Sequence, residues 1–517
     1  MKFDKRQILR NVGSSWFALG VNVVSGIFLS PYILHRLGDT AFGLWILIFS
    51  ITGYYGLFDL GIRSSIVRYV AKFSATNEQE ELNRLVNTAM FSYTGIGVVA
   101  MAITLIAAYY VDSIFRIPAE FLVTARWLLL MAGTAVSLGF PFGVFGGILE
   151  GLQRFYLLNF TTMSSTLIRV LLIVIALKHG RGLLTIALIT VSMPLLSGLI
   201  NAAAVFRHLN LRLGLQHVSR SSLRRIASYS GTTFVIIVAG RLRFKTDAMV
   251  IGTMVSAAAV TYFAIGSRLV DYASELVSSL AQIFVPMSSQ SQAKGDLDAL
   301  RKIFVVGNRA CAFIIFPITA ILTILGKSVI EAWVGPKYVA TSYPVLLVLL
   351  YPTTLMLAQS ASGRTLWGIA KHRTWAWVVL AEGVSNLILS IILVRPYGIM
   401  GDAIGTAIPL TCSMILFLPR HLCRLLGIKL TTYLYRAFVL PLVLCIPLVT
   451  ALLLMQRWYV PHRLGPLLLQ LVIACLVYGV GLAWAFWTHR AWDVGLLGAN
   501  QEDELTFALV ETYQEEV

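Results

Sequence analysis

Three cations and one anion lie close together in an otherwise apolar stretch of the sequence, AGRLRFKTDAMVIG (239–252). At about 100° per residue along a helix, Arg241 and Lys245 share one face, while Arg243 and Asp247 share another. An arginine and an aspartate one helical turn apart can neutralise each other, so we interpret Arg243 and Asp247 as a structural ion pair. Arg241 and Lys245 then remain as uncompensated positive charges, and arginine matches phosphate oxygens through paired hydrogen bonds.

A second charged group lies in the apolar stretch 259–287. Arg268, Asp271 and Glu275 are spaced so that all three fall on one stripe of a helix. Two acidic residues one turn apart repel each other, and one of them can hold a proton. Asp271 and Glu275 are therefore candidates for coupling to a proton or sodium gradient, and structural pairing with Arg268 is an equally open interpretation. Arg268 itself is a further candidate for binding phosphate.

Charged residues also occur in two stretches of the N-terminal half. Asp59 and Arg63 are one helical turn apart near the inner end of a predicted helix, which favours a structural ion pair, with anion binding by Arg63 as the alternative. Arg169 lies near the middle of another predicted helix. A charge at bilayer depth costs roughly 2.5–3.5 kcal/mol on insertion scales, so these side chains should face protein or water. The sequence thus predicts an interior path rich in arginine.

The elements that carry these charges are membrane helices. Of the 517 residues, 57% are hydrophobic and 13% are charged, and the mean hydropathy is +0.79, as in polytopic membrane proteins. A membrane-spanning helix takes roughly 20 apolar residues, and no room is left for a separate soluble domain. We predict an all-α fold with about fourteen transmembrane helices, at 11–34, 43–66, 87–111, 125–149, 156–177, 183–206, 227–253, 259–287, 304–325, 343–366, 375–394, 401–419, 437–455 and 464–487.

The distribution of positive charge predicts the orientation of these helices. With the N-terminus inside, most loop lysines and arginines fall on the inner side, so both termini are expected in the cytoplasm. The net charge of +17 follows from this bias and does not point to nucleic acid. The five cysteines have no paired spacing, so neither a disulfide nor a metal site is predicted. No cofactor is expected.

An internal repeat divides the chain. VGSSWFAL (12–19) aligns with SGTTFVII (230–237), and TLIRVLLIVIAL aligns with GVSNLILSIILV at nearly the same shift. Because the first segment of the repeat runs uninterrupted, we expect helix 227–253 to be continuous. The predicted parts are a six-helix bundle at 1–206, a basic cytoplasmic linker at 207–226, a second six-helix bundle at 227–419, two additional helices at 420–487 and an acidic cytoplasmic tail at 488–517.

Several stretches resemble the flippase family for polysaccharides and lipid-linked oligosaccharides of the O-antigen type, within the superfamily that also holds the MATE multidrug exporters and the lipid II flippase. Each stretch is loose alone, but their order over residues 11–420 is specific. They are HRLGDTAFGLW (35–45), FDLGIRSSIVRYVAK (58–72), GILEGLQRF (147–155), TDAMVIGTMVSAAAVTYFAIGSRLV (246–270), EAWVGPKY (331–338) and YGIMGDAIGTAIP (397–409).

The resemblance implies two bundles around a central cavity, alternating access and no ATP hydrolysis. It implies a bacterial cytoplasmic (inner) membrane protein that moves a polyprenyl-pyrophosphate-linked glycan to the outer leaflet for O-antigen, capsule or exopolysaccharide. Its partners would be this glycan, membrane lipids, and the polysaccharide polymerase and export machinery. Relatives hold the pyrophosphate with cations in the first helix of each bundle. Here Arg241 and Lys245 fit that role, but residues 11–34 carry no charge, which leaves Arg63 or Arg169 as substitutes.

The sequence leaves two other classes of function open. An ion-coupled small-molecule exporter of the MATE type is the main alternative, although exporters of organic cations would favour acidic cavities over the cationic excess seen here. A membrane-embedded glycan polymerase or ligase is a weaker alternative, since the sequence contains no nucleophile, metal or nucleotide motif. The sequence therefore predicts a transporter and no enzyme.

Overall fold

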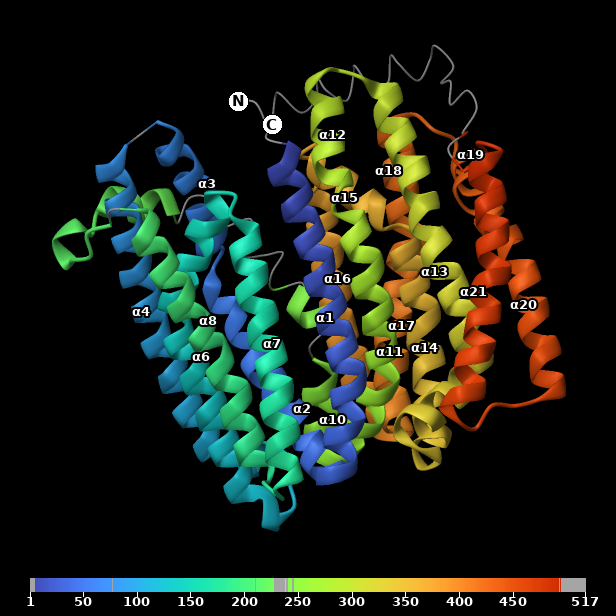
Figure 1. Ribbon diagram of the computed structural model, residues 1–517, viewed down its shortest axis with the longest axis horizontal. Helices are drawn as coiled ribbons and strands as arrows, with labels where there is room; N and C mark the ends of the chain where they lie inside the picture. Colours follow the sequence, from blue (N-terminus) through green and yellow to red (C-terminus); the bar gives the residue numbers. More distant parts are fainter. Residues whose placement is uncertain are drawn as a thin grey trace. The chain divides into compact units, whose positions relative to one another are not determined.

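The computed structural model describes residues 5–76, 78–209, 211–226, 238, 240–243, 246–491 and 493. The regular structure of these residues is helical throughout, with no strand among them, which confirms the predicted all-α membrane fold. The chain divides into two compact units, residues 1–261 and 262–517 (Figure 1). Lys245, most of the stretch 227–239 and residues 494–517 of the predicted tail lie outside the described residues.

Unit 1 is built around the long helix α6 (Leu122–Gly151), which packs against α2, α3, α4 and α8 (Figure 1). Helix α7 packs against α1 and α8. The other elements are α1 (Lys5–Leu37), α2 (Asp39–Gly53), η1 (Tyr54–Asp59), α3 (Ile62–Ala75), α4 (Gln79–Tyr109), α5 (Val111–Ile114), η2 (Ala119–Phe121), α7 (Phe155–Lys178), α8 (Leu183–His208), η3 (Leu215–His217), α10 (Asp247–Met254) and the start of α11 (Ala257–Ala281).

Small residues of α6 explain its central place. A Cβ atom on Gly133 would lie 2.2 Å from Oγ1 of Thr104 in α4, and one on Gly151 would lie 2.9 Å from the carbonyl oxygen of Val67 in α3. Such close approach is typical of membrane helices, whose association depends on van der Waals packing between small residues. Larger residues at these positions would force the neighbouring helices apart.

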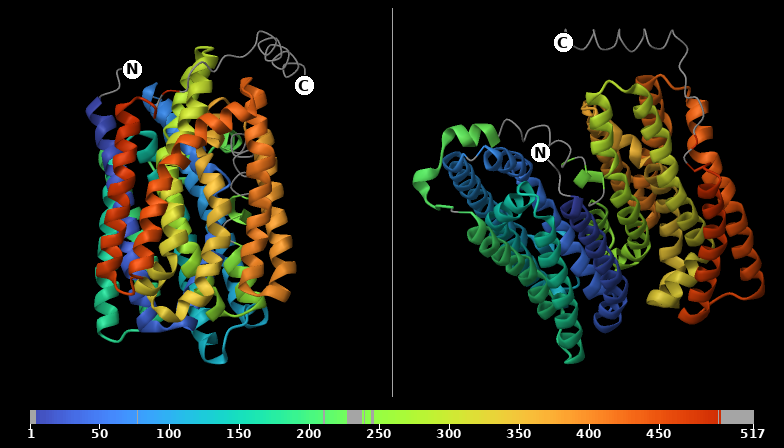
Figure 2. Two further views of the ribbon diagram at one scale, coloured as in Figure 1. Left: turned by 90° about the vertical axis from the view of Figure 1, so that its right-hand side faces the viewer. Right: turned by 45° about the horizontal axis from the view of Figure 1, so that its top comes forward.

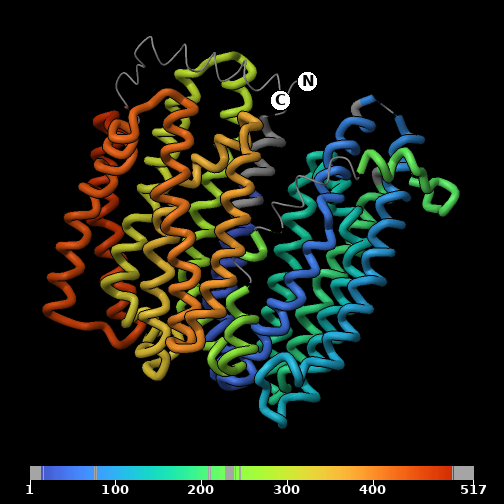
Figure 3. Tube along the Cα trace, turned by 180° about the vertical axis from the view of Figure 1, so that it is seen from behind, coloured from blue at the N-terminus to red at the C-terminus, as the bar shows by residue number. Residues whose placement is uncertain are grey.

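Unit 2 is organised around the 38-residue helix α13 (Leu297–Val334), which packs against α12, α14, α15, α20 and α21. Helix α16 packs against α17, and α17 packs against α14 (Figure 3). The other elements are α12 (Phe284–Ala293), η4 (Pro336–Tyr338), α14 (Val339–Ala358), α15 (Ser360–Gly368), α16 (Arg373–Tyr397), α17 (Ile399–Cys412), the π-helical turn η5 (Ser413–Phe417), α18 (Leu418–Leu426), α19 (Leu430–Leu434), the π-helical turn η6 (Tyr435–Val439), α20 (Leu440–Trp458) and α21 (Leu464–Trp487).

Twelve helical segments of the described chain are long and apolar enough to cross a membrane, and each overlaps one of the fourteen predicted spans. The two remaining predictions have different outcomes. The span at 259–287 corresponds mainly to α11, which is long enough but carries Arg268, Asp271 and Glu275. The span at 227–253 falls largely on residues outside the described part. The two additional C-terminal helices are α20 and α21, which lie side by side (Figure 2).

One predicted helix is interrupted where the sequence suggested continuity. The prediction of one helix over 43–66 is wrong, because Leu60 and Gly61 adopt left-handed conformations with φ of 49° and 78° and separate η1 from α3. This interruption lies two residues before Arg63, a residue with a candidate functional role. The prediction of an unbroken helix over 227–253 stays a prediction, because most of residues 227–245 lie outside the described part of the chain, where α10 begins at Asp247.

Candidate functional site

The guanidinium group of Arg241 lies against the end of α2 and the first turn of η1 in unit 1. An ideal Cβ atom on Gly56 would lie 2.5 Å from Nη2 of Arg241, closer than the 3.0 Å below which real Cβ contacts essentially never occur. A Cβ atom on Gly53 would lie 4.0 Å from Nη1 of the same side chain. Arg241 therefore occupies a space that exists because residue 56 has no side chain. We call this arrangement of Gly56 and Arg241 the Gly56 notch.

The local backbone explains why this notch forms. Helix α2 ends at Gly53, and the chain continues through the tighter turns of η1 before the left-handed pair Leu60 and Gly61 redirects it into α3. The hydroxyl group of Tyr54, the first residue of η1, lies 2.6 Å from Oγ1 of Thr246 and donates to the carbonyl oxygen of Arg241 at 3.4 Å. These contacts hold the segment around Arg241 against the end of α2.

The charge of Arg241 has no counter-charge in the described part of the chain. Its guanidinium group forms no salt bridge and donates no hydrogen bond to any described residue. Its predicted companion Lys245 lies outside the described residues. Arg243 is 6% exposed, and both Arg243 and Asp247 take part in polar interactions, but their mutual pairing stays a prediction. Arg241 is thus available to an anion.

Arg169 in α7 is a second arginine that has no counter-charge among the described residues. Its side chain is half-buried, and its Nε atom is buried without a hydrogen-bond partner among the described residues. No described acidic residue forms a salt bridge with it. Polar contacts join the same helix to α1, since Thr166 donates to Asn22 at 3.1 Å. Arg169 therefore places a second uncompensated cation within a membrane span of unit 1.

Arg63 and Asp59 each have a partner that the sequence interpretation did not assign. Nη2 and Nε of Arg63 donate to the two carboxylate oxygens of Glu150 in α6, at 2.6 Å and 3.3 Å. The hydroxyl group of Tyr93 in α4 donates to Asp59. Glu150 thus supplies the paired contact with Arg63 that had been predicted for Asp59. This two-point contact balances the charge of Arg63, so Arg63 is a weaker candidate for binding an anion than Arg241 or Arg169.

Arg268 in unit 2 lies among the residues predicted to share its stripe of α11. Its Nη1 atom is 3.8 Å from Oδ2 of Asp271, and its Cζ atom lies 4.7 Å from the ring centroid of Tyr272. Glu275 lies on the same stripe and also makes polar interactions. The side chains of Arg268 and Asp271 are 42% and 53% exposed, so both remain accessible. Arg268 is therefore a partly balanced cation next to an aromatic face and an acidic residue.

Arg309 shows how a charged residue in a span can serve structure alone. This side chain is 4% exposed and donates to four backbone carbonyl oxygens, those of residues 436, 490, 491 and 493. These carbonyl groups belong to η6 and to the segment just after α21. Arg309 thus fastens the C-terminal helices to α13, and its burial among these carbonyl groups makes it a poor candidate for binding a ligand.

A buried polar network that the sequence interpretation missed joins α16 to α17. Oδ1 of Asn386 accepts hydrogen bonds from Ser390 at 3.0 Å and from Thr406 at 3.1 Å. Glu382 accepts from Ser413 at 2.5 Å. All of these side chains are buried, and Gly405 permits the approach, since a Cβ atom there would lie 2.6 Å from Ser390. The available signal was the run of polar residues at helical spacing within these two apolar helices.

The structure thus sorts the predicted cations by their surroundings. Among the described residues, no acidic side chain balances Arg241 or Arg169 in unit 1, whereas Glu150 balances Arg63 and Asp271 partly balances Arg268 in unit 2. The most informative residue missed in the sequence was Gly56. Two glycines three residues apart at the end of an apolar helix could have indicated that another group approaches the backbone there.

Comparison with known proteins places this arrangement in context. Residues 8–292 match a family model described as polysaccharide biosynthesis protein. The chain is 20% identical to the "Uncharacterized membrane protein EpsK" of Bacillus subtilis, over 81% of this chain and 84% of that protein. It is 18% identical to the "Putative O-antigen transporter" of Shigella flexneri, over 79% of this chain and 96% of that protein.

A solved structure shares the fold. The lipid II flippase MurJ, in its inward closed conformation, superposes with a TM-score of 0.70 at 16% sequence identity. The match covers 93% of this chain and 99% of that chain. The helical order found here is therefore that of a known multi-pass membrane transporter fold, which agrees with the resemblance seen in the sequence.

Proposed function

Because this chain belongs to the polysaccharide biosynthesis protein family, we propose that it is a flippase for a polyprenyl-pyrophosphate-linked oligosaccharide. The substrate would pass from the cytoplasmic to the outer leaflet of a bacterial inner membrane, with both termini of the protein in the cytoplasm. The observation that carries this proposal is the uncompensated guanidinium group of Arg241 in the Gly56 notch. A pyrophosphate presents several oxygens to such a group, and planar guanidinium geometry suits paired contacts with them.

The surroundings of each arginine support different roles. Arg241 and Arg169 are proposed to hold the pyrophosphate, since neither has an acidic partner in the described chain. Arg63, which Glu150 already binds, is proposed to exchange partners only when the substrate is present. Arg268 would add a further contact, with Lys245 as a companion of Arg241. The N-terminal half would then contribute to the phosphate site through α7, because residues 11–34 carry no charge.

Moving the bound lipid across the membrane requires no covalent chemistry. We propose alternating access, in which the two units move relative to each other around the substrate while the polyprenyl tail stays in the bilayer. Asp271 and Glu275 are proposed to couple this cycle to a proton or sodium gradient. An acidic residue can bind an ion on one side of the membrane and release it on the other. The ion then moves down its gradient, and the free energy released drives the transport cycle. Surface polysaccharide polymerase and export machinery would act on the delivered glycan.

Reconstituted transport tests the role of Arg241. The purified chain is placed in liposomes that carry a polyprenyl-pyrophosphate-linked galactose, and membrane-impermeant galactose oxidase scores its appearance in the opposite leaflet. Arg241→Ala is expected to lower the initial rate about tenfold or more, because it removes charge-assisted hydrogen bonds. Arg241→Lys should keep part of the rate. Arg126→Ala removes an exposed partner of Asp112 and serves as the control, with an unchanged rate expected.

The same assay defines the result that contradicts the proposal. If Arg241→Ala transports the probe at the parental rate while reaching the liposomes at the parental level, the Gly56 notch has no role in substrate binding. If the parent itself moves a fluorescent organic cation but not the lipid-linked galactose, the chain is a small-molecule exporter and the proposed substrate class is wrong.

A further inference from the structure

Residues 211–226, which follow α8, lie against the first three turns of α4 in unit 1. We call this segment the α4 strap, and Figure 1 shows it in green beside α4. It contains η3, and its last residues, from Arg220 onward, are helical. Arg225 forms a salt bridge with Glu81 of α4 at 2.6 Å. The strap belongs to the basic linker predicted from the sequence, and no residue proposed to bind the substrate or an ion lies in it.

Side chains of α4 hold the backbone of the strap. Asn87 accepts a hydrogen bond from the backbone N–H group of Gly214 at 2.8 Å and donates to the carbonyl oxygen of Arg212 at 2.8 Å. The hydroxyl oxygen of Thr88 accepts from the backbone N–H group of Ser219 at 3.0 Å. Both of these α4 side chains are buried. Because the bonds use backbone groups of the strap, they fix its course without engaging its side chains.

The strap exposes four large apolar side chains. Leu213, Leu215 and Leu223 are 46%, 76% and 47% exposed, and Val218 is 36% exposed. None of them belongs to a membrane-spanning helix, so they are not the ordinary lipid-facing residues of a span. A cluster of exposed apolar side chains outside a span is typical of a surface that binds a membrane or another protein.

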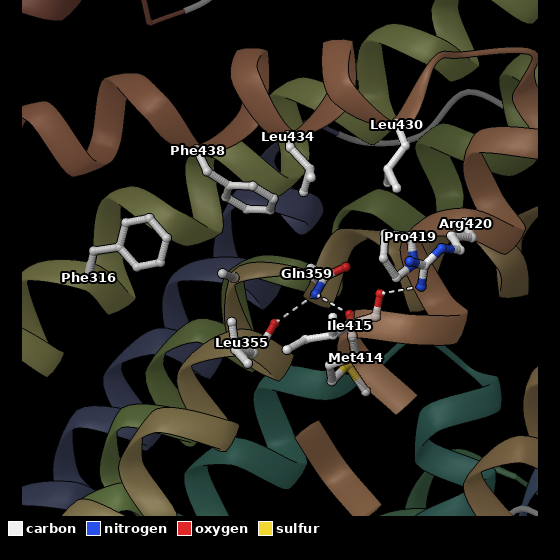
Figure 4. A pocket seen from close by; sticks show the side chains of 11 residues that line it. Phe316, Leu355, Gln359, Met414, Ile415, Pro419, Arg420, Leu430, Leu434 and Phe438 are labelled. Atoms are coloured by element: carbon white, nitrogen blue, oxygen red, sulfur yellow. Dashed lines mark hydrogen bonds between the residues drawn. The ribbon is translucent and has the colours of Figure 1, made fainter. Parts of the chain in front are cut away.

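Exposed arginines alternate with these apolar side chains. Arg212, Arg220 and Arg224 are exposed, and none of them forms a salt bridge with a described residue. An arginine of unit 2 shows the contrast, since Arg420 donates to two backbone carbonyl oxygens of η5 (Figure 4). The strap contains no acidic residue. Its outer surface is therefore both apolar and positively charged, and it complements an anionic partner with apolar groups.

The position of the strap along α4 places this surface near the lipid head groups. The membrane-spanning part of α8 ends at Arg207, only a few residues before the strap. Helix α4 has 31 residues and is therefore about 46 Å long, whereas the hydrocarbon core of a bilayer is about 30 Å thick. The charged residues of α4, which are Glu80, Glu81 and Arg84, all lie in its first two turns, so the excess length is at this end. The strap binds the same end of α4, beside the bilayer surface.

We propose that the α4 strap binds the surface of an anionic phospholipid leaflet. Its three exposed leucines insert at the boundary between head groups and acyl chains, and its three exposed arginines bind lipid phosphate groups. Six candidate spans precede the strap, so it lies on the same side of the membrane as the N-terminus. In the orientation proposed above, this side is the cytoplasmic leaflet, where anionic lipids are common. The strap thereby attaches unit 1 to the leaflet, whichever substrate the protein carries.

Fluorescence quenching in nanodiscs tests this surface on the full-length protein. An environment-sensitive fluorescent amino acid replaces Leu215, and a phospholipid with a nitroxide near its head group is the quencher. Quenching is expected to be several-fold stronger in nanodiscs of phosphatidylcholine with phosphatidylglycerol than in phosphatidylcholine alone, because the arginines draw the strap to anionic head groups. The same fluorophore in place of Glu78, an exposed residue just before α4, is the control and should show little quenching in either lipid.

Charge variants separate lipid binding from a general effect of charge. Arg220→Gln combined with Arg224→Gln should lower the quenching at residue 215 to the level seen in phosphatidylcholine alone. Lys294→Gln combined with Lys302→Gln removes two exposed cations of unit 2 and should change nothing. Quenching of residue 215 by aqueous acrylamide in both lipids would overturn the proposal, since the leucines would then be free to bind a protein. Equal nitroxide quenching in both lipids, unchanged by the two arginine substitutions, would also overturn it, because insertion would not depend on lipid charge.

Discussion

The Gly56 notch makes the position of one arginine depend on the absence of one methyl group. Arg241 is the far end of a flexible side chain, so a new Cβ atom at residue 56 would displace the guanidinium group and leave the backbone of η1 largely in place. A substitution at residue 56 is therefore expected to change the position of the Arg241 guanidinium group without changing the stability of the fold. Most substitutions in a packed membrane helix disturb function and stability together.

Gly56→Ala is therefore expected to lower transport of the lipid-linked galactose about tenfold, close to the effect of Arg241→Ala, because charge-assisted contacts with the pyrophosphate are lost in both variants. The melting temperature should change little. Gly95→Ala is the matched control, since a Cβ atom there would meet nothing within 4 Å. Initial rates in liposomes provide the measurement, and equal rates for Gly56→Ala and Gly95→Ala would contradict the role of the notch.

At the scale of elements, the contact between α16 and α17 depends on close backbone approach. A Cβ atom on Gly401 would lie 2.0 Å from the carbonyl oxygen of Leu393, and this oxygen belongs to the backbone of a helix and cannot turn aside. The buried hydrogen bonds of Asn386 require the same close approach. This contact is therefore a determinant of folding, in contrast to the Gly56 notch.

Gly401→Ala should destabilise unit 2 by about 1–3 kcal/mol through overpacking. The expected sign is a lower melting temperature and a smaller monodisperse fraction in detergent, both measured on purified protein. Gly363→Ala is the control, because its Cβ atom would make only an ordinary contact of 3.8 Å with Trp375. A parental melting temperature for Gly401→Ala would show that the two helices can separate without cost.

The elements also show what the sequence can and cannot predict. Long apolar runs predicted the twelve membrane spans, because a span must bury nearly all of its length in lipid or protein. The break at Leu60 was not predicted, since hydropathy is continuous through this position. The partner of Arg63 was missed for a related reason. Glu150 is close only after α3 folds against α6, and spacing along one helix favoured Asp59 instead.

At the scale of the whole molecule, the two compact units differ from the halves of the predicted repeat. Unit 1 extends to residue 261 and includes α10, whereas the repeat places the start of the second half near residue 227. The Gly56 notch joins one residue from each half of the repeat within a single unit. Separately expressed halves cut at the repeat boundary would therefore divide the notch between two polypeptides.

The proposed coupling to an ion gradient also belongs to this scale. An inward-directed proton or sodium gradient across the liposome membrane should raise the initial rate of lipid-linked galactose transport several-fold, because the gradient drives the return of the empty carrier. Asp271→Asn should remove this dependence and preserve the slow rate seen without a gradient. Parallel liposomes with each gradient imposed singly identify the ion. Rates that ignore both gradients in the parent would contradict the assignment of Asp271.

The Gly56 notch has a consequence for the descent of such transporters. A chain that loses Arg241 no longer gains anything from glycine at position 56, and a chain that first acquires a larger residue there can no longer seat the arginine. Substitution at either position should thus relax selection on the other. Among descendants of a common ancestor, glycine and arginine at these two positions are expected to be kept together or lost together, although they lie 185 positions apart in the sequence.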